Sequence, residues 1–222
     1  MHVRIPVIAT ACVILSLSAC GGGGGGGDNA PQPVQTQILS DAQFDGDIEQ
    51  TSPNTFTITQ GMSSTVQSVF AGIDPVAGTE FRAFLDFPLT GSGGVPGNAS
   101  IDSAFLEFYV DDLQPSTGKL PLRVDLVAFQ PPTLIETDFD RTVQPALASV
   151  IVTPDISSSD VGKFVPVDVT ALMVEAQRRG LVDFQVRIME DLGPPIPVLM
   201  IIDDSTGAAR GSRAPLLTVT YF

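Results

Sequence analysis

Four acidic side chains whose oxygens suit a hard cation lie close together in the chain: Asp41, Asp45, Asp47 and Glu49. Calcium binds roughly six to eight oxygen ligands and tolerates irregular loops, and Gly46 between these acids allows a turn. The spacing does not match the EF-hand, whose loop has about twelve residues. The stretch is therefore a candidate calcium site. The alternative is a turn whose acids are solvated.

Adjacent acids are the residues that suggest catalysis, because paired carboxylates hydrolyse glycosides. Neighbouring residues on a strand point to opposite faces of the sheet, so such pairs do not converge. In turns, acids are usually solvated or accept hydrogen bonds from the local backbone. We therefore expect no enzyme activity, and a carboxylate-dependent glycosidase or lyase stays as the alternative. The pairs are Asp111-Asp112, Glu190-Asp191 and Asp203-Asp204.

Aromatic side chains are the third kind of candidate, since sugar-binding sites use rings as platforms. The chain has 13 Phe and only 2 Tyr, with no Trp. Most Phe fall on the inward faces of expected strands, whereas Tyr109 falls on the polar face of its strand, as does Glu107. Tyr109 and Phe84, together with the acids, form a candidate ligand-binding site.

The only cysteine beyond the leader is Cys20, which ends the stretch 17–20 (Leu-Ser-Ala-Cys). Before it, Arg4 precedes the apolar run 5–17, which is too short for a membrane span of about 20 residues. The stretch 17–20 resembles the lipobox of bacterial lipoproteins. The resemblance implies that 1–19 is a signal peptide and that Cys20 is lipidated and anchors the protein to a membrane.

A glycine-rich tether, 20–37, follows the leader. The glycine run 21–27 is typical of a flexible coil and lacks the Lys-Ser/Thr that closes a phosphate-binding loop. In the bacterial sorting rule, Asp directly after the lipidated cysteine retains a lipoprotein at the inner membrane. Gly21 stands at that position, so the resemblance implies lipid anchoring at the outer membrane of the cell envelope, with the periplasmic or the surface face left open.

Composition excludes several kinds of function. The formal net charge is -14, with only 11 Lys and Arg, so a nucleic-acid partner is not expected. Removal of 1–19 takes away His2, the sole histidine, and Cys12. A Ser-His-Asp triad and a Cys-His pair are then impossible, and a zinc site is not expected.

Alternating apolar and polar residues through 38–222 predict many short strands. In 122–128, for example, Leu122, Val124 and Leu126 share one face, while Asp125 points outward. Arg187 is expected to point outward from its own strand by the same rule. The expected strands are 55–59, 65–70, 81–87, 103–110, 122–128, 165–169, 182–188, 198–202 and 217–221.

One segment, 171–179, has the pattern of a short helix with Leu172, Met173 and Ala176 toward the sheets. Gly180 suits the left-handed residue after a helix. No strand-helix repeat supports a parallel sheet. The expected fold class is therefore all-β: an antiparallel β-sandwich, of jelly-roll type, with one short helix.

The order of these segments resembles the DNRLRE-type jelly-roll domain of bacterial surface proteins, which is related to some carbohydrate-binding modules. The resemblance covers 38–222 and implies a jelly roll, a link to carbohydrate binding, and the structural calcium that such jelly rolls often carry. The chain departs from the family by lacking Trp, and 129–155 matches nothing in it. The stretches that carry the resemblance are 44–47 (Phe-Asp-Gly-Asp), 81–87 (Phe-Arg-Ala-Phe-Leu-Asp-Phe), 99–109, 167–170 (Val-Asp-Val-Thr) and 215–221.

Together these observations favour a lipid-anchored, non-catalytic β-sandwich protein of the cell envelope with a structural or binding role. A carbohydrate-binding module that captures polysaccharide is the second hypothesis. An exposed aromatic row beside polar groups would favour binding, and a featureless convex face would favour a structural role.

Overall fold

The computed structural model describes residues 31–128, 132–191 and 197–222. The leader 1–19, Cys20 and the glycine run lie outside the described residues, so the predictions made for them stay predictions. The first strand begins at Val34, which pairs with Tyr221. Residues 34–37, which sequence analysis assigns to the tether, are thus part of the sheet.

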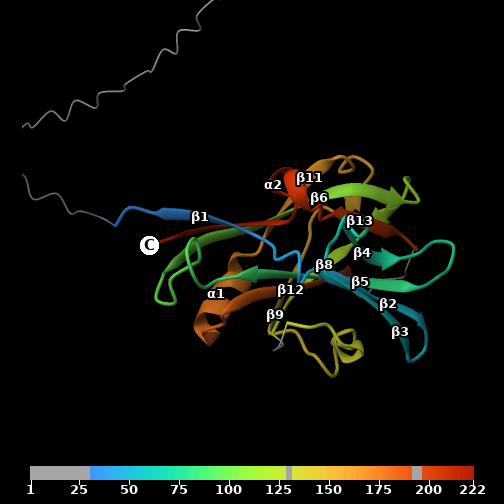
Figure 1. Cartoon of the computed structure of the whole chain (residues 1–222), viewed down its shortest axis with the longest axis horizontal. Helices are drawn as coiled ribbons and strands as arrows, with labels where there is room; N and C mark the ends of the chain where they lie inside the picture. Colours follow the sequence, from blue (N-terminus) through green and yellow to red (C-terminus); the bar gives the residue numbers. More distant parts are fainter. Residues whose placement is uncertain (1–30, 129–131, 192–196) are drawn as a thin grey trace, which may run out of the picture. The chain divides into compact units, whose positions relative to one another are not determined.

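The described residues form an antiparallel β-sandwich, as predicted. Twelve strands make one continuous hydrogen-bonded sheet that curls over itself into two layers (Figure 1). The strands are β1 (Val34–Leu39), β2 (Gly46–Ser52), β3 (Thr55–Gln60), β4 (Ser68–Ile73), β5 (Glu80–Pro88), β6 (Ile101–Gln114), β7 (Lys119–Leu120), β8 (Leu122–Val127), β9 (Ala148–Ile151), β10 (Ile156–Ser157), β11 (Lys163–Asp168), β12 (Asp183–Glu190), β13 (Leu199–Asp203) and β14 (Leu216–Tyr221). The short strands β7 and β10 pair only with each other.

We call the two layers sheet I and sheet II. In sheet I the long strand β6 pairs with β14, β13 and β11. Strand β1 pairs with β14, and β4 pairs with β13. In sheet II the order is β3, β2, β5, β12, β8 and β9. The layers join where β4 meets β5, through the pairs Gly72↔Phe81 and Ile73↔Glu80.

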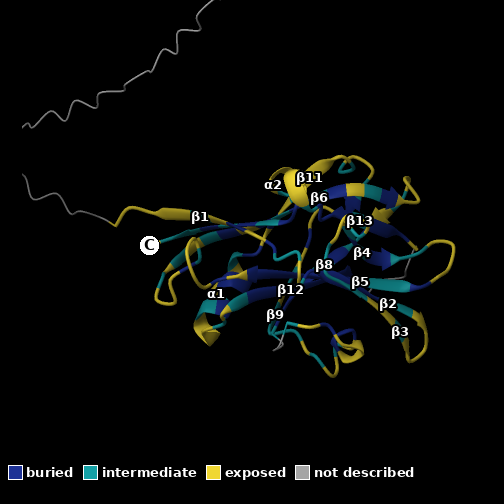
Figure 2. Ribbon diagram, in the orientation of Figure 1, coloured by how far each residue is buried: buried dark blue, intermediate teal, exposed yellow. Residues whose placement is uncertain are grey.

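The core lies between the layers, where the apolar faces of both meet. The inward residues of β6, Ala104, Leu106, Phe108 and Val110, are fully buried, as the alternation predicts. Figure 2 shows burial concentrated along the strands, with α2 and β1 largely exposed. Burial of each large apolar side chain stabilises the fold by about 1.5–3 kcal/mol, which explains why the alternation determines the layering.

The predicted helix is present as α1 (Thr170–Arg179), and it packs against β6, β8 and β9. Leu172, Met173 and Ala176 are buried, and Gly180 adopts the left-handed conformation, both as predicted. The one-turn helix α2 (Arg210–Arg213) and the short 3-10 turns η1 (Glu136–Asp138) and η2 (Gly207–Ala209) are additional to the prediction.

The outer face of sheet II differs from its prediction. Asp125 and Arg187, expected to point into solvent, are fully buried. Residues 132–147, which we call the cover segment, lie across this face, drawn in yellow below the sheets in Figure 1. Carbonyl oxygens of the cover segment accept hydrogen bonds from Arg187, at 2.8 Å from Asp138 and 3.2 Å from Gln144. The alternation places these charges correctly on the outward face, but the face is not solvated.

Candidate ligand-binding site

The outer face of sheet I is formed by side chains from four adjacent strands in register. Glu107 of β6 lies opposite Leu216 of β14 on one side and Pro166 of β11 on the other. Leu216 in turn lies opposite Leu39 of β1. Directly opposed residues point to the same face of a sheet, so these side chains form one continuous surface.

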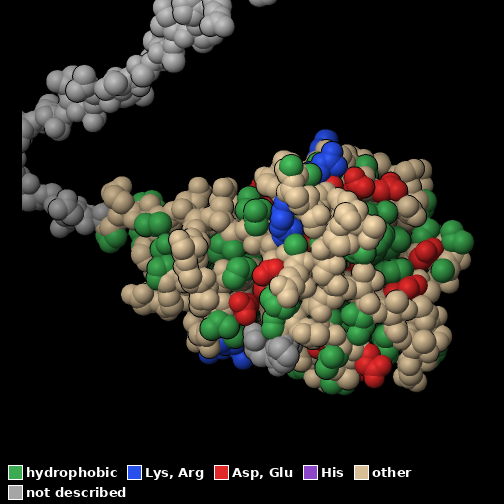
Figure 3. Space-filling model, in the orientation of Figure 1, with side chains coloured by type: hydrophobic (Ala, Val, Ile, Leu, Met, Phe, Trp, Pro, Cys, Tyr) green, Lys and Arg blue, Asp and Glu red, His purple; other side chains and the backbone are tan. Residues whose placement is uncertain are grey.

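A hollow of about 400 Å³ lies on this surface, where α2 stands over the strands. We call it the α2 hollow. Its apolar lining consists of Phe164, Leu39, Ala214 and Leu216. The polar lining comes from Gln37, Glu107 and Ser212, with Gly211 completing the wall. In the face drawn in Figure 3, charged side chains are few and scattered among uncharged atoms.

Tyr109 lies beside the hollow and is not one of its lining residues. It is only half-exposed, because its ring packs edge-on against Phe164, with centroids 5.4 Å apart and planes at 74°. The guanidinium of Arg213 lies 5.0 Å from its ring centre, a cation-π distance. Tyr109 therefore supports the ring of Phe164 and the position of α2, and offers less free ring surface than expected.

Phe84 does not belong to this surface. It is 2% exposed and packs with Ile48, Leu134 and Phe139 beneath the cover segment. A buried ring cannot stack on a ligand, so its expected part in a binding site is wrong. It lies on sheet II, across the sandwich from Tyr109, because it sits in β5 and not in β6.

Two exposed rings on the outer face of sheet I were missed. Phe105 is 40% and Phe164 is 41% exposed, and both share the face of Glu107. The period-two rule could have found them, since Phe105 alternates with the inward Ala104 and Leu106. Phe164 likewise precedes the inward series of β11. An apolar residue at an outward position was the available signal.

The four acids of the candidate calcium site are separated in the structure. Asp45 is fully buried and Asp47 is 2% exposed, so a turn with solvated acids is also wrong for them. Gly46 begins β2, and a side chain there would come within 2.2 Å of the carbonyl oxygen of Thr59. The glycine is needed for the close approach of β2 to β3, and not for the turn that the sequence suggests.

Each of these acids has its own surroundings. Asp41 accepts a hydrogen bond from the backbone N–H of Gln43 at 2.9 Å, and Asp45 Oδ1 accepts one from the N–H of Asp86 at 2.9 Å. Burial raises the pKa of Asp47 to about 7, against a hydrogen bond from the Phe70 backbone that lowers it. Within the described ranges, no group of three or more acidic, His or Cys side chains is arranged to hold a metal ion.

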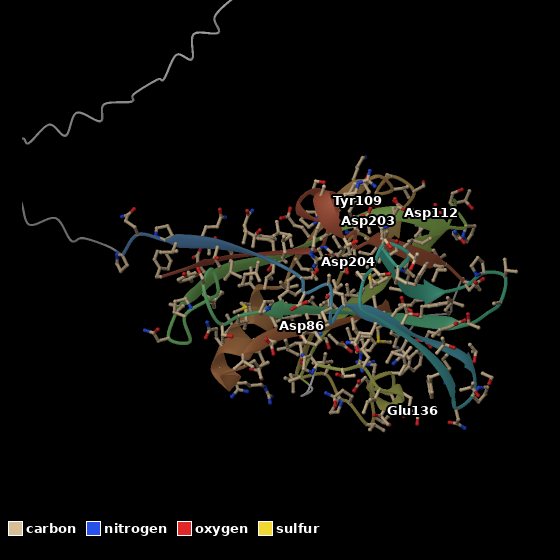
Figure 4. The ribbon with its side chains drawn as sticks, viewed as in Figure 1. Asp86, Tyr109, Asp112, Glu136, Asp203 and Asp204 are labelled. Carbon is tan, nitrogen blue, oxygen red and sulfur yellow. The ribbon has the colours of Figure 1, made fainter. Side chains whose placement is uncertain are left out.

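Adjacent acids point apart, as predicted for a strand. Asp203 lies opposite Tyr109 on the outer face and pairs with Arg213 at 3.1 Å. Asp204 is fully buried and pairs with Arg210 at 2.7 Å. Figure 4 labels both at the end of β13, with Tyr109 nearby and Glu136 far away in the cover segment.

In the other two adjacent acid pairs, each carboxylate likewise has its own surroundings. Asp111 is exposed, and Asp112 accepts a hydrogen bond from the backbone N–H of Leu113. Glu190 is 8% exposed, and burial, followed by the negative charge of Glu80, raises its pKa to about 7. Asp191 instead pairs with Arg123 at 2.9 Å. Asp203 and Asp204 have different arginine partners, while a bulge at Asp111-Asp112 interrupts the alternation of β6.

A second hollow, of about 390 Å³, lies between the β2–β3 hairpin and the cover segment, with Arg82 and Arg141 in its wall. Both arginines already have acidic partners. Arg82 pairs with Glu80 at 2.7 Å, and Arg141 lies 3.2 Å from Asp125. The charges that would attract an anion are thus matched within the protein.

Two further findings bear on identity. None of the helices in the described part of the chain is long and apolar enough to cross a membrane. No protein-family model matches the chain, and no curated protein matches it.

Proposed function

We propose that the chain is a lipid-anchored, non-catalytic binding protein of the bacterial cell envelope, whose β-sandwich binds polysaccharide at the α2 hollow. The observation that carries the proposal is the hollow itself. It combines the exposed ring of Phe164 and the aliphatic side chains of Leu39 and Leu216 with the polar groups of Gln37 and Glu107. A featureless convex face, which would favour a purely structural role, is not what this side of sheet I presents.

The lining suits a sugar because saccharides carry both apolar C–H faces and hydroxyl groups. Phe164 offers a ring for the C–H face, and the Gln37 amide and Glu107 carboxylate offer partners for hydroxyls. An anionic sugar is disfavoured, because Glu107 carries a negative charge in a protein whose formal net charge is -14. The proposed ligand is therefore a neutral polysaccharide.

A non-catalytic role is supported by the accessibility of the acids. Asp45 and Asp204 are one pair of carboxylates that converge, and both are 0% exposed. A glycosidase needs its two carboxyl groups on either side of a substrate bond, which a sugar could not reach here.

A glycan array probed with the full chain in detergent tests the binding site. Phe164→Ala should weaken binding of a neutral oligosaccharide at least about tenfold, which corresponds to about 1.4 kcal/mol of lost contact. Phe222→Ala is the matched control, because Phe222 is 47% exposed but lies outside the hollow. If no glycan binds, or if both variants bind as the wild type does, the hollow is not a sugar site and the structural role is favoured.

The anchor is tested separately by fractionation. Cys20→Ser should release the protein from membranes, because the proposed lipid is attached to that thiol. Cys12→Ser, in the leader, should leave the protein membrane-bound. A Cys20→Ser protein that still fractionates with membranes would show that the anchor is wrong.

A further inference from the structure

A buried cluster lies beneath α2 and connects it to the turn after β1. Arg210, the first residue of α2, donates from Nη1 to Asp204 Oδ1 at 2.7 Å. Its Nη2 donates to the carbonyl oxygen of Ser40 and to Ser40 Oγ, the latter at 3.2 Å. The same Nη2 lies 3.7 Å from Asp45 Oδ2. One guanidinium therefore joins the segment after β13 to the segment after β1, which are far apart in the sequence.

Asp45 is one of the acids of the candidate calcium site, and the residues around it do not fit a metal ion. Calcium needs roughly six to eight oxygens. Only two carboxylates converge here, those of Asp45 and Asp204. The oxygens of Asp204 and Ser40 that face the cluster accept hydrogen bonds from Arg210. The guanidinium of Arg210 already supplies a positive charge beside these carboxylates.

We propose that Arg210 is the resident cation of this fold in place of calcium, and that it positions α2 as the wall of the α2 hollow. The second clause rests on the proposed function. Leu39, which lines the hollow from β1, directly precedes Ser40, and Gly211 and Ser212 directly follow Arg210. The contact between Arg210 and Ser40 thus fixes two walls of the hollow against each other.

Charge balance supports a single cation at this place. Asp45 and Asp204 are fully buried. Burial raises the pKa of both acids, and the negative charge of Asp204 raises that of Asp45 further. Two close carboxylates that retain one proton between them carry one negative charge, which Arg210 neutralises. The remaining charge that faces the pair is Asp203, which Arg213 neutralises.

This charge balance predicts different outcomes for the two acids. Asp204 accepts a hydrogen bond from Arg210 at 2.7 Å, whereas Asp45 lies 3.7 Å from the guanidinium, so Asp204 is the main charge partner of Arg210. Asp45→Asn leaves the hydrogen bond to Asp204 intact, so α2 should stay in place. Arg210→Met removes the cation, and Asp204→Asn removes its charged acceptor at 2.7 Å and leaves only the more distant Asp45 at 3.7 Å, so both should displace α2.

The experiment uses 3-fluorotyrosine and ¹⁹F NMR on the full chain in detergent, with no glycan present. The chain has two tyrosines, and Tyr109→Phe assigns the resonance that reports the Arg213 contact of α2. Arg210→Met and Asp204→Asn should shift the Tyr109 resonance and lower Tm by about 10 °C. Asp45→Asn and the exposed control Arg179→Met should leave the resonance unchanged. EDTA should leave both the resonance and Tm of the wild type unchanged.

Either of two results would overturn the proposal. One is a wild-type Tyr109 resonance that moves on adding EDTA and returns with calcium, which would make calcium the resident cation. The other is an unchanged Tyr109 resonance in Arg210→Met or Asp204→Asn. Should these two variants fail to fold, a shifted Tyr109 resonance in Asp45→Asn would also contradict the charge assignment. Because no sugar is involved, a failure of glycan binding would reject the proposed function without affecting this result.

Discussion

The two outer faces of the sandwich depart from simple alternation in opposite ways. On sheet I, Phe105 and Phe164 stand at outward positions and are exposed. On sheet II, Asp125 and Arg187 stand at outward positions and are fully buried. The alternation itself is kept on both faces, so the difference is not one of strand register. It comes from what lies over each face.

The cover segment explains the difference. It shields the outer face of sheet II from water, so the charges there need partners inside the protein. Arg187 donates to Asp125 at 2.9 Å, and Ser149 Oγ donates to Asp125 at 2.6 Å. On sheet I, the single turn of α2 stands over one end, beside the α2 hollow. The comparison indicates that the cover segment encloses the charges of sheet II, while Phe105 and Phe164 on sheet I stay exposed.

The largest expected effect comes from breaking the buried charge pair on sheet II. Arg187→Met should destabilise the fold by about 3–5 kcal/mol, because it leaves Asp125 and two carbonyl oxygens without this donor in a buried place. Arg178→Met is the matched control, since its pair with Glu175 is exposed and screened by solvent, so its loss of stability should be much smaller. Urea unfolding of both variants measures the difference. Equal losses would mean that the cover segment does not isolate its face from water.

The second expected effect is a difference in stability between variants of Phe84 and Phe164, one on each sheet. Phe84→Ala should cost about 3–5 kcal/mol, as for other buried rings, while Phe164→Ala should cost about 1 kcal/mol. Thermal unfolding shows which variant loses more stability. On the glycan array we expect the opposite order, with Phe164→Ala losing more binding than Phe84→Ala. If Phe84→Ala were the milder change, the two faces would have been assigned the wrong roles.

The smallest expected effect is the pH dependence of stability. Burial raises the pKa of Asp47 to about 7 and that of Asp86 to about 6, and both lie on strands of sheet II. Between their unfolded values near 4 and these folded values, the native state binds more protons than the unfolded chain. Stability should therefore fall as pH rises from about 4 to about 7, so Tm should be lower at pH 8 than at pH 5. Asp47→Asn should flatten the profile, and an unchanged profile in that variant would remove Asp47 as a cause.

Much of the fold was predictable because alternation and helix end signals are local. The strands around Phe108, Leu126 and Phe184, and the helix that ends at Gly180, form where the pattern indicates. The acids at 45–47 were misjudged, because an Asp-Gly-Asp stretch indicates a turn while the structure makes it the start of β2. Tyr109 was placed on the correct face, and Phe164, which lines the hollow, lies opposite it in the register with β11.

The sequence by itself determined the all-β class, the inward face of most strands, the position of α1 and the expectation of a lipid anchor at Cys20. Only the tertiary structure decided which outward residues meet water. Whether Phe84 or Phe164 is accessible depends on the cover segment and α2, which approach from distant parts of the chain. Such contacts leave no local periodicity, so the hollow and the Arg210 cluster became visible only in the folded protein.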